Sequence, residues 1–277
     1  MPFFDTPEPI SATLEFDIAS VRITASKRMD TVVEVRPANA ANETDVRAAQ
    51  QTSVTCAGGK LLVKGPRKRS LFGRSGSLDV SVELPAGSHL RGASPMADFI
   101  CEGVLGDCRI KTSAGDIQID AAGTVDLRTD YGDIRVDRVD GDAEVVAAGR
   151  IELGRIAGVG TVKNANGDTI VGEAVGDLRV TSSNGQISVD VAHAGVDVKS
   201  ANGGVRIGEV ARGRTTVLTA AGDVEIGIRE STAAWLDLNS LGGVHSELGP
   251  AEGPGADDET VEVRARTGFG DIVIRRA

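Results

Sequence analysis

Five aspartates each follow a recurring glycine, and Arg150, Gln186 and Gly204 take their place after three other glycines of the series. The aspartates are Asp116, Asp133, Asp168, Asp223 and Asp271. Such a column of carboxylates could coordinate calcium, or act as the acid and base of a polysaccharide-cleaving β-helix. The sequence lacks the GGxGxDxUx nonapeptide of calcium-binding β-rolls, and its period is twice too long. Because the aspartates repeat with the turn, we expect them to accept backbone N–H groups there.

Other residue types with catalytic or metal-binding chemistry form no recognisable constellation. The histidines are His89, His193 and His245, and they form neither HxH nor HExxH. They therefore predict no zinc site. No GxSxG is present, so no nucleophile elbow is expected. We predict that the chain is not an enzyme and that it has no catalytic residue, no metal and no cofactor.

Three asparagines precede glycines at intervals of 18 residues. Asn166, Asn184 and Asn202 stand before Gly167, Gly185 and Gly203. Asn-Gly readily adopts the positive φ angles of a tight turn. In stacked coils the three amides would form a hydrogen-bonded ladder along the axis. A polar recognition stripe is the alternative, but turn chemistry favours the structural interpretation.

The aspartates and asparagines are positioned by a repeat that covers most of the chain. Glycines recur every 17 to 19 residues from Gly115 to Gly222, usually with Ile, Val or Leu two and four positions later. A second apolar pair usually lies seven and five residues before each glycine. This period-two pattern predicts two short strands per coil that meet at a glycine corner, with a third, weaker side. The predicted fold is all-β, a single-stranded β-helix (a solenoid) of about 18 residues per coil.

The first part of the chain has longer strands than the repeats. We predict that residues 10–95 form a β-sandwich-like cap and that residues 96–277 form the solenoid. Within the cap, we expect a short helix near residues 41–51 and a hairpin that turns at Gly58 and Gly59.

Two features interrupt the solenoid near its end. An acidic Pro/Gly-rich loop at residues 248–259 separates Gly242 from Gly270. One coil earlier, TAAWLDL contains the bulky pair Trp235 and Leu236, which we expect to plug the C-terminal end.

A basic loop between Gly65 and Ser77 contrasts with the acidic background. Its candidate interaction residues are Arg67, Lys68, Arg69, Leu71, Phe72 and Arg74. The loop could contact anionic lipid, nucleic acid or an acidic partner, with the two apolar residues at its tip. The alternative is a solvated loop without a partner.

The composition of the chain indicates which classes of partner and which cellular compartment are favoured. The chain has 277 residues and a net charge of -10, which disfavours nucleic-acid binding. Three cysteines without CxxC indicate reduced thiols, and Cys108 occupies a predicted core position. The N-terminus lacks the pattern of a signal peptide, and no apolar run is long enough to span a membrane. We therefore expect a cytoplasmic protein.

The repeat motifs also resemble a known family. The S/T-x-x-G-D-I/V-x-I/V units, the VELPAGS segment before them and the closing GDIVIRR are similar to the bacterial putative-adhesin family of β-strand-repeat proteins. The resemblance extends from about Leu14 to Arg276. It implies a β-solenoid and no catalytic residues, and the family is a domain of unknown function.

These observations favour a non-enzymatic scaffold or interaction protein with a protein partner. One alternative is a polymer-forming cytoskeletal protein similar to bactofilins, and the other is an exported adhesin or glycan binder. If both ends of the solenoid are covered, the chain should be a monomer or a small oligomer that does not form filaments.

Overall fold

The computed structural model describes residues 2–66, 75–249, 253 and 259–277. The chain divides into two compact units, residues 1–138 and 139–277, and each is described by itself. Strands make up most of both units, and α1 (Glu43–Gln51) is the one helix among the described residues. No described helix has the length and apolar character needed to cross a membrane.

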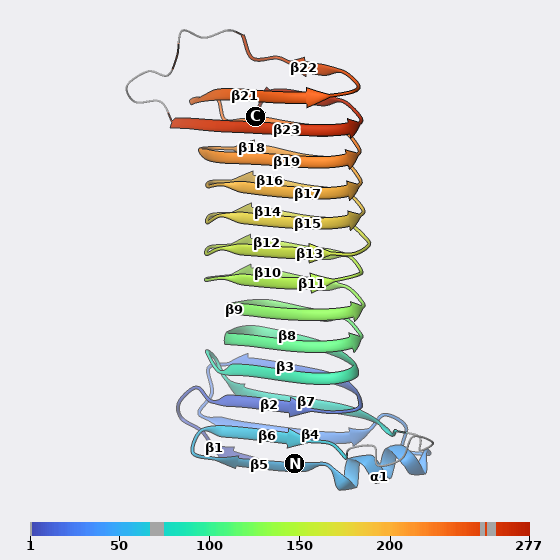
Figure 1. The fold of residues 1–277 in the computed structure, drawn as a ribbon. Coiled ribbons are helices and arrows are strands. Elements are labelled where there is room, and N and C mark those ends of the chain that lie inside the picture. Colours follow the sequence, from blue (N-terminus) through green and yellow to red (C-terminus); the bar gives the residue numbers. More distant parts are fainter. Residues whose placement is uncertain (1, 67–74, 250–252, 254–258) are drawn as a thin grey trace. The chain divides into compact units, whose positions relative to one another are not determined.

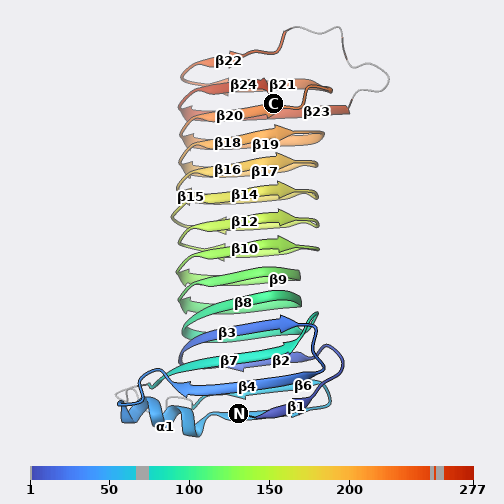
Figure 2. The same cartoon turned by 180° about the vertical axis from the view of Figure 1, so that it is seen from behind.

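The second unit is a stack of parallel coils, each with two strands (Figures 1 and 2). Residues 18 positions apart pair in register, as Leu178 does with Val196 and Ile187 does with Val205. The predicted solenoid is therefore confirmed. One side consists of β11 (Ala143–Ala147), β13 (Gly160–Asn164), β15 (Leu178–Asn184), β17 (Val196–Asn202) and β19 (Gly213–Ala221). The other consists of β12 (Ile151–Ile156), β14 (Thr169–Ala174), β16 (Ile187–Ala192), β18 (Val205–Val210) and β20 (Val224–Ile228).

The interior of these coils is a column of aliphatic side chains. Ile187 and Val189 stack on Val205 and Ile207, and all four are buried. At the corner between the two sides, Gly185 has a φ of 103°. A Cβ atom there would lie 2.1 Å from the carbonyl oxygen of Gly167 in the previous coil. The corner therefore requires glycine because the backbones of adjacent coils approach closely.

The last coil of the chain does not lie at the end of the stack. β23 (Glu259–Phe269) pairs with β19 on one side and with β21 (Thr232–Ser240) on the other. Likewise β24 (Ile272–Arg276) pairs with both β20 and β22 (Val244–Ser246). The final coil is thus inserted beneath the coil that precedes it in sequence (Figure 1). The acidic loop at residues 248–259 connects the two, and most of it lies outside the described residues.

The first unit contains the same kind of insertion. β2 (Ser11–Glu15) pairs in parallel with both β6 (Lys60–Lys64) and β8 (His89–Ala114). β3 (Ile18–Ser26) pairs in parallel with both β7 (Ser77–Pro85) and β8. The N-terminal coil therefore lies between two later segments of the chain. β8 also pairs with β9 (Ile117–Tyr131), and β10 (Ile134–Val139) contains the boundary between the units.

Antiparallel strands complete the first unit. β1 (Phe3–Asp5) pairs with β4 (Asp30–Pro37), and β4 pairs with β7. β5 (Ser53–Ala57) and β6 form the predicted hairpin, which turns at Gly58 and Gly59 with φ angles of 55° and 70°. The strands thus pair in the two groups β5–β6–β2 and β1–β4–β7–β3. The sandwich-like cap stays a prediction.

The predicted helix near residues 41–51 is confirmed as α1. The side chain of Asn42 accepts the backbone N–H of Thr44 and caps the helix. The predicted division at residue 95 lies within β8, which continues to Ala114. That division stays a prediction.

Candidate interaction surface on the terminal coils

The basic loop falls on residues that the structure does not describe. Arg67, Lys68, Arg69, Leu71, Phe72 and Arg74 lie outside the described residues. Their role as an interaction loop stays a prediction.

The recurring aspartates accept hydrogen bonds from the backbone of the next coil. The N–H of Asp133 donates to Oδ1 of Asp116 at 2.8 Å, and the N–H of Gln186 donates to Oδ1 of Asp168 at 2.9 Å. The N–H of Asp271 donates to Oδ1 of Asp223 at 2.9 Å. These carboxylates therefore join successive turns. Across the described part of the chain, no group of three or more His, Cys, Asp or Glu residues could hold a metal.

The corner asparagines bond to one another along the stack. Nδ2 of Asn184 donates to Oδ1 of Asn166 at 2.9 Å, and Nδ2 of Asn202 donates to Oδ1 of Asn184 at 3.1 Å. The column then becomes apolar, since Ala221 pairs with Asn202 and Phe269 pairs with Ala221. Phe269 is exposed. The outer corner of the stack thus changes from polar to apolar at the terminal coils.

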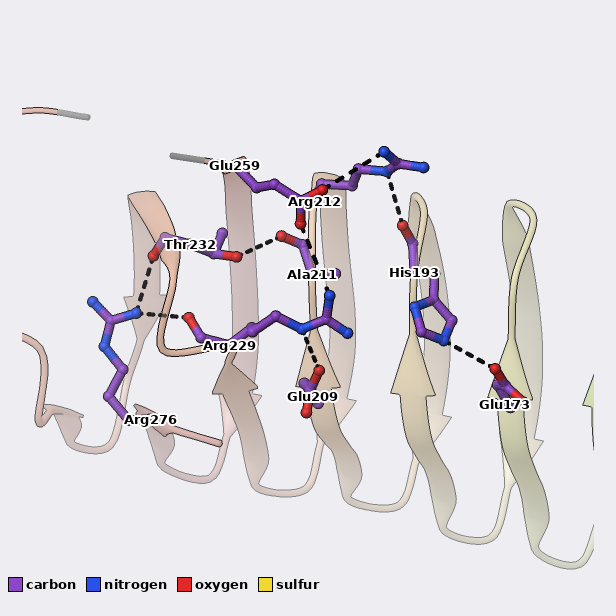
Figure 3. Close-up of polar contacts among 9 residues, drawn as sticks. All are labelled: Glu173, His193, Glu209, Ala211, Arg212, Arg229, Thr232, Glu259 and Arg276. Carbon is purple, nitrogen blue, oxygen red and sulfur yellow. Dashed lines mark hydrogen bonds and ion pairs between the residues drawn. The ribbon is translucent and has the colours of Figure 1, made fainter. Parts of the chain in front are cut away.

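A row of charged side chains connects neighbouring coils of the second unit (Figure 3). Nε2 of His193 lies 3.0 Å from Oε1 of Glu173, and Nε of Arg229 lies 2.5 Å from Oε1 of Glu209. Arg212 contacts Glu259 of the inserted coil at 3.6 Å. Partly exposed pairs of this kind contribute little stability each, about 0–1 kcal/mol. The pairs link side chains of successive coils.

The same row holds the C-terminal strand in place. Nη1 of Arg276 donates to the carbonyl oxygens of Arg229 and Thr232, at 2.9 and 3.0 Å. The hydroxyl of Thr232 donates to the carbonyl oxygen of Ala211 at 2.7 Å. These bonds attach the end of β24 to the connection between β20 and β21 (Figure 3). They satisfy polar groups at the point where the inserted coil meets its neighbours.

The cysteines are free thiols, and two of them belong to the core. Cys101 and Cys108 are buried, which bears out the core position predicted for Cys108. Burial raises the pKa of both thiols well above the usual value. They are therefore protonated at neutral pH and unsuited to act as nucleophiles.

Trp235 lies on the outer face of the second unit. Its side chain is 55% exposed, so the prediction that it plugs the end is wrong for Trp235, while Leu236 of the predicted pair lies at an inward position. Alternate residues of β21 face opposite ways, and Leu236 pairs with the buried Val263 while Trp235 pairs with the partly exposed Glu262. The Arg264 guanidinium carbon lies 5.8 Å from the centroid of the Trp235 ring, a cation–π contact.

An ion-pair network surrounds this tryptophan. Glu262 lies 2.8 Å from Arg264 and 2.9 Å from Arg214 of β19. We call Arg214, Trp235, Glu262 and Arg264 the Trp235 face. It borders a groove of about 1640 Å³ whose lining also includes Ala234 and Leu236 of β21. An exposed aromatic ring among paired charges suits binding by contact.

Sequence reasoning missed the Trp235 face. The single tryptophan was a visible signal, but its direction depends on the register of β21 against β23. That register pairs residues on either side of the acidic loop. No local sequence pattern specifies such a long-range pairing.

Comparisons with solved structures give matches at low identity and low TM-score. A putative adhesin from Parabacteroides merdae is 13% identical, with a TM-score of 0.41 over 100% of this chain and 95% of that chain. A putative adhesin from Bacteroides fragilis is 9% identical, with a TM-score of 0.36 over 99% of this chain and 95% of that chain. A putative lipid binding protein from Parabacteroides distasonis is 10% identical, with a TM-score of 0.29 over 100% and 95%.

No curated protein matches the chain. The model of the Toastrack DUF4097 family matches residues 12–268. That span includes the repeats and most of the cap, which are the segments that carried the resemblance in the sequence. The resemblance is thereby confirmed, and the chain belongs to the Toastrack DUF4097 family.

Proposed function

We propose that this chain is a non-enzymatic interaction scaffold that binds a protein partner through the Trp235 face. The observation that carries the proposal is the exposed Trp235 ring beneath Arg264, at the edge of a groove. Tryptophan and arginine are enriched among the residues that dominate protein–protein binding energy. Covering a half-exposed indole removes apolar surface from water, and the rigid coils hold it in place with little loss of entropy.

The non-enzymatic part of the proposal is supported by how the reactive groups are engaged. The recurring aspartates accept N–H groups of the next coil, as Asp116 and Asp168 do. Both core thiols are buried and protonated. Function must be argued from a site, and the site that stands out in the described residues is a contact surface.

The partner's charge and the compartment follow from composition. A net charge of -10 disfavours nucleic acid and anionic surfaces as general partners. The three free thiols suit a reducing compartment, so we place the proposed activity in the cytoplasm. Cell fractionation with an antibody to the chain tests this placement, and recovery with the cell surface would instead favour the exported adhesin or glycan binder.

Site-specific photo-cross-linking tests the proposed surface. Benzoylphenylalanine replaces Thr260, an exposed residue that also lines the groove, in cells that produce the chain. We expect a discrete adduct with one other protein. Trp235→Ala should reduce its yield at least about tenfold, because the aromatic anchor is lost.

Tyr131 supplies the matched control, since it is also an exposed aromatic but lies in the first unit. Tyr131→Ala should leave the adduct unchanged, and benzoylphenylalanine at position 131 should not form it. If no adduct forms at Thr260, or if Trp235→Ala leaves its yield intact, the Trp235 face is not the binding surface.

A further inference from the structure

In the described part of the chain, strand β21 of the outermost coil of the second unit has one edge without a paired strand. All nine residues of β21 pair with β23, and no other described strand pairs with β21. Elsewhere in the stack, inward residues donate their N–H to the following coil. The N–H of Leu178 donates to the carbonyl of Gly195, and that of Ile272 to the carbonyl of Gly243, both at 2.9 Å. By the same geometry, the N–H and C=O groups of Ala234, Leu236 and Leu238 point to the open edge. Those of Thr232 instead bond to Arg229 and Arg276.

The apolar interior is also incompletely covered at this edge. Ala234, Leu236 and Leu238 occupy the inward positions of β21, and all three are partly exposed. The residues they stack on, Val261, Val263 and Ala265, are at most 2% exposed. On the other side of the coil, Val244 of β22 stacks on the buried Ile272 and is 44% exposed. Among the described residues, no further coil covers these inward side chains.

β21 carries none of the devices that usually keep an exposed edge from pairing. Its sequence, TAAWLDLNS, contains no lysine, arginine, proline or glycine, and Asp237 is its one charged residue. Edge strands that must stay single typically have such residues or a bulge. The open edge of β21 can therefore pair with a further strand.

We infer that this edge binds β21 of a second copy, in antiparallel pairing about a two-fold axis at Leu236. Inward residues would then meet residues of the same kind: Leu236 faces Leu236, Ala234 faces Leu238, and Thr232 faces Ser240. The outward Asp237 meets Trp235 of the other copy. Antiparallel two-fold pairing is self-complementary and closes at two copies.

Other registers fit less well. Centring the axis on Asp237 places two carboxylates opposite each other, which is unfavourable. Centring it on Leu238 places Leu236 against Ser240, and centring it on Trp235 places Leu238 against Thr232. The register at Leu236 is the one of these that matches apolar with apolar and polar with polar along the inner face. This match favours a second copy over an unrelated strand.

The mass of the purified chain tests the pairing. Sedimentation over a roughly hundredfold range of concentration should show a species at twice the 28.6 kDa chain mass. Leu236→Lys should weaken it at least about 100-fold, because pairing would bury an unpaired charge. The variant should still fold, since Leu236 is partly exposed in the single copy. Asn239→Lys adds the same charge on the outer face and should leave the pair intact.

Disulfide cross-linking tests the register in a Cys56→Ser background, where the remaining cysteines are buried. Directly opposite residues have Cα atoms about 5.5 Å apart, within disulfide range. Leu236→Cys should therefore form a cross-linked pair. Leu238→Cys should form no cross-link, because position 238 of one copy would lie about 14 Å along the strands from position 238 of the other. A parent that stays monomeric, a Leu236→Lys variant that still pairs, equal cross-linking at both positions, or filaments would each overturn the inference.

Discussion

At the scale of single residues, the side chains stacked at one corner of the coils change from amides to apolar groups along the column. Asn166, Asn184 and Asn202 bond through their amides, and Ala221 and Phe269 continue the column without polar groups. A side-chain amide can both donate and accept, so it can extend a ladder from coil to coil. Where the amides end, the stack presents an apolar corner to solvent.

The central asparagine of the ladder should contribute more to the free energy of unfolding than a terminal one. Asn184→Ala removes the bonds to both neighbours, whereas Asn202→Ala removes the bond to Asn184. We expect Asn184→Ala to lower the free energy of unfolding by about 1 kcal/mol, since exposed neutral hydrogen bonds contribute modestly. Asn202→Ala should lower the free energy of unfolding by a smaller amount. Urea denaturation measures both.

Binding to the proposed partner should survive Asn184→Ala. A variant that kept its stability and lost the cross-linked adduct would make the asparagine column a recognition stripe.

At the scale of elements, the inserted coil is the feature that organises the end of the second unit. β23 has hydrogen-bonded neighbours on both sides, and its inward residues Val261, Val263 and Ala265 are buried. β21 has a neighbour on one side in the described structure and keeps its inward residues partly exposed. The internal place therefore buries the inward residues of the final coil, whereas those of the coil before it stay partly exposed.

Hydrogen exchange should reveal this order directly. The amides of β23 should exchange far more slowly than the inward amides of β21, because opening an internal strand breaks two ladders. The comparison uses dilute protein, where the second copy is absent, and the Leu236→Lys variant as a control. Faster exchange in β23 than in β21 would place the C-terminal coil at the open end.

At the scale of the whole molecule, each unit stacks a coil out of sequence order. In the first unit β2 and β3 lie between later strands, and in the second unit β23 and β24 lie between earlier ones. Both insertions use backbone pairing and aliphatic contacts, as every other coil does. Stability then comes from neighbouring coils, much as in other repeat proteins.

Removal of metal ions should leave this stability unchanged. The aspartates of the corners, such as Asp168 and Asp223, accept backbone N–H groups in the structure and so have their charge stabilised without a cation. We expect the melting temperature to be the same with a chelator and with added calcium. A shift of many degrees would show that the carboxylate columns bind calcium.

The repeat, the inward register and the glycine corners could all be predicted from the amino-acid sequence. These are local properties, because a period of two buries one face of a strand and a tight corner requires positive φ. Thus Ile187 and Val205 could be placed in the core from the sequence alone.

The sequence does not show which coil lies outermost, and therefore shows neither the direction of Trp235 nor the open edge of β21. Parallel coils pair through backbone groups that every residue shares, so no local motif specifies the order of stacking. That order follows from the apolar surface each coil buries and from the length of the loops that connect them.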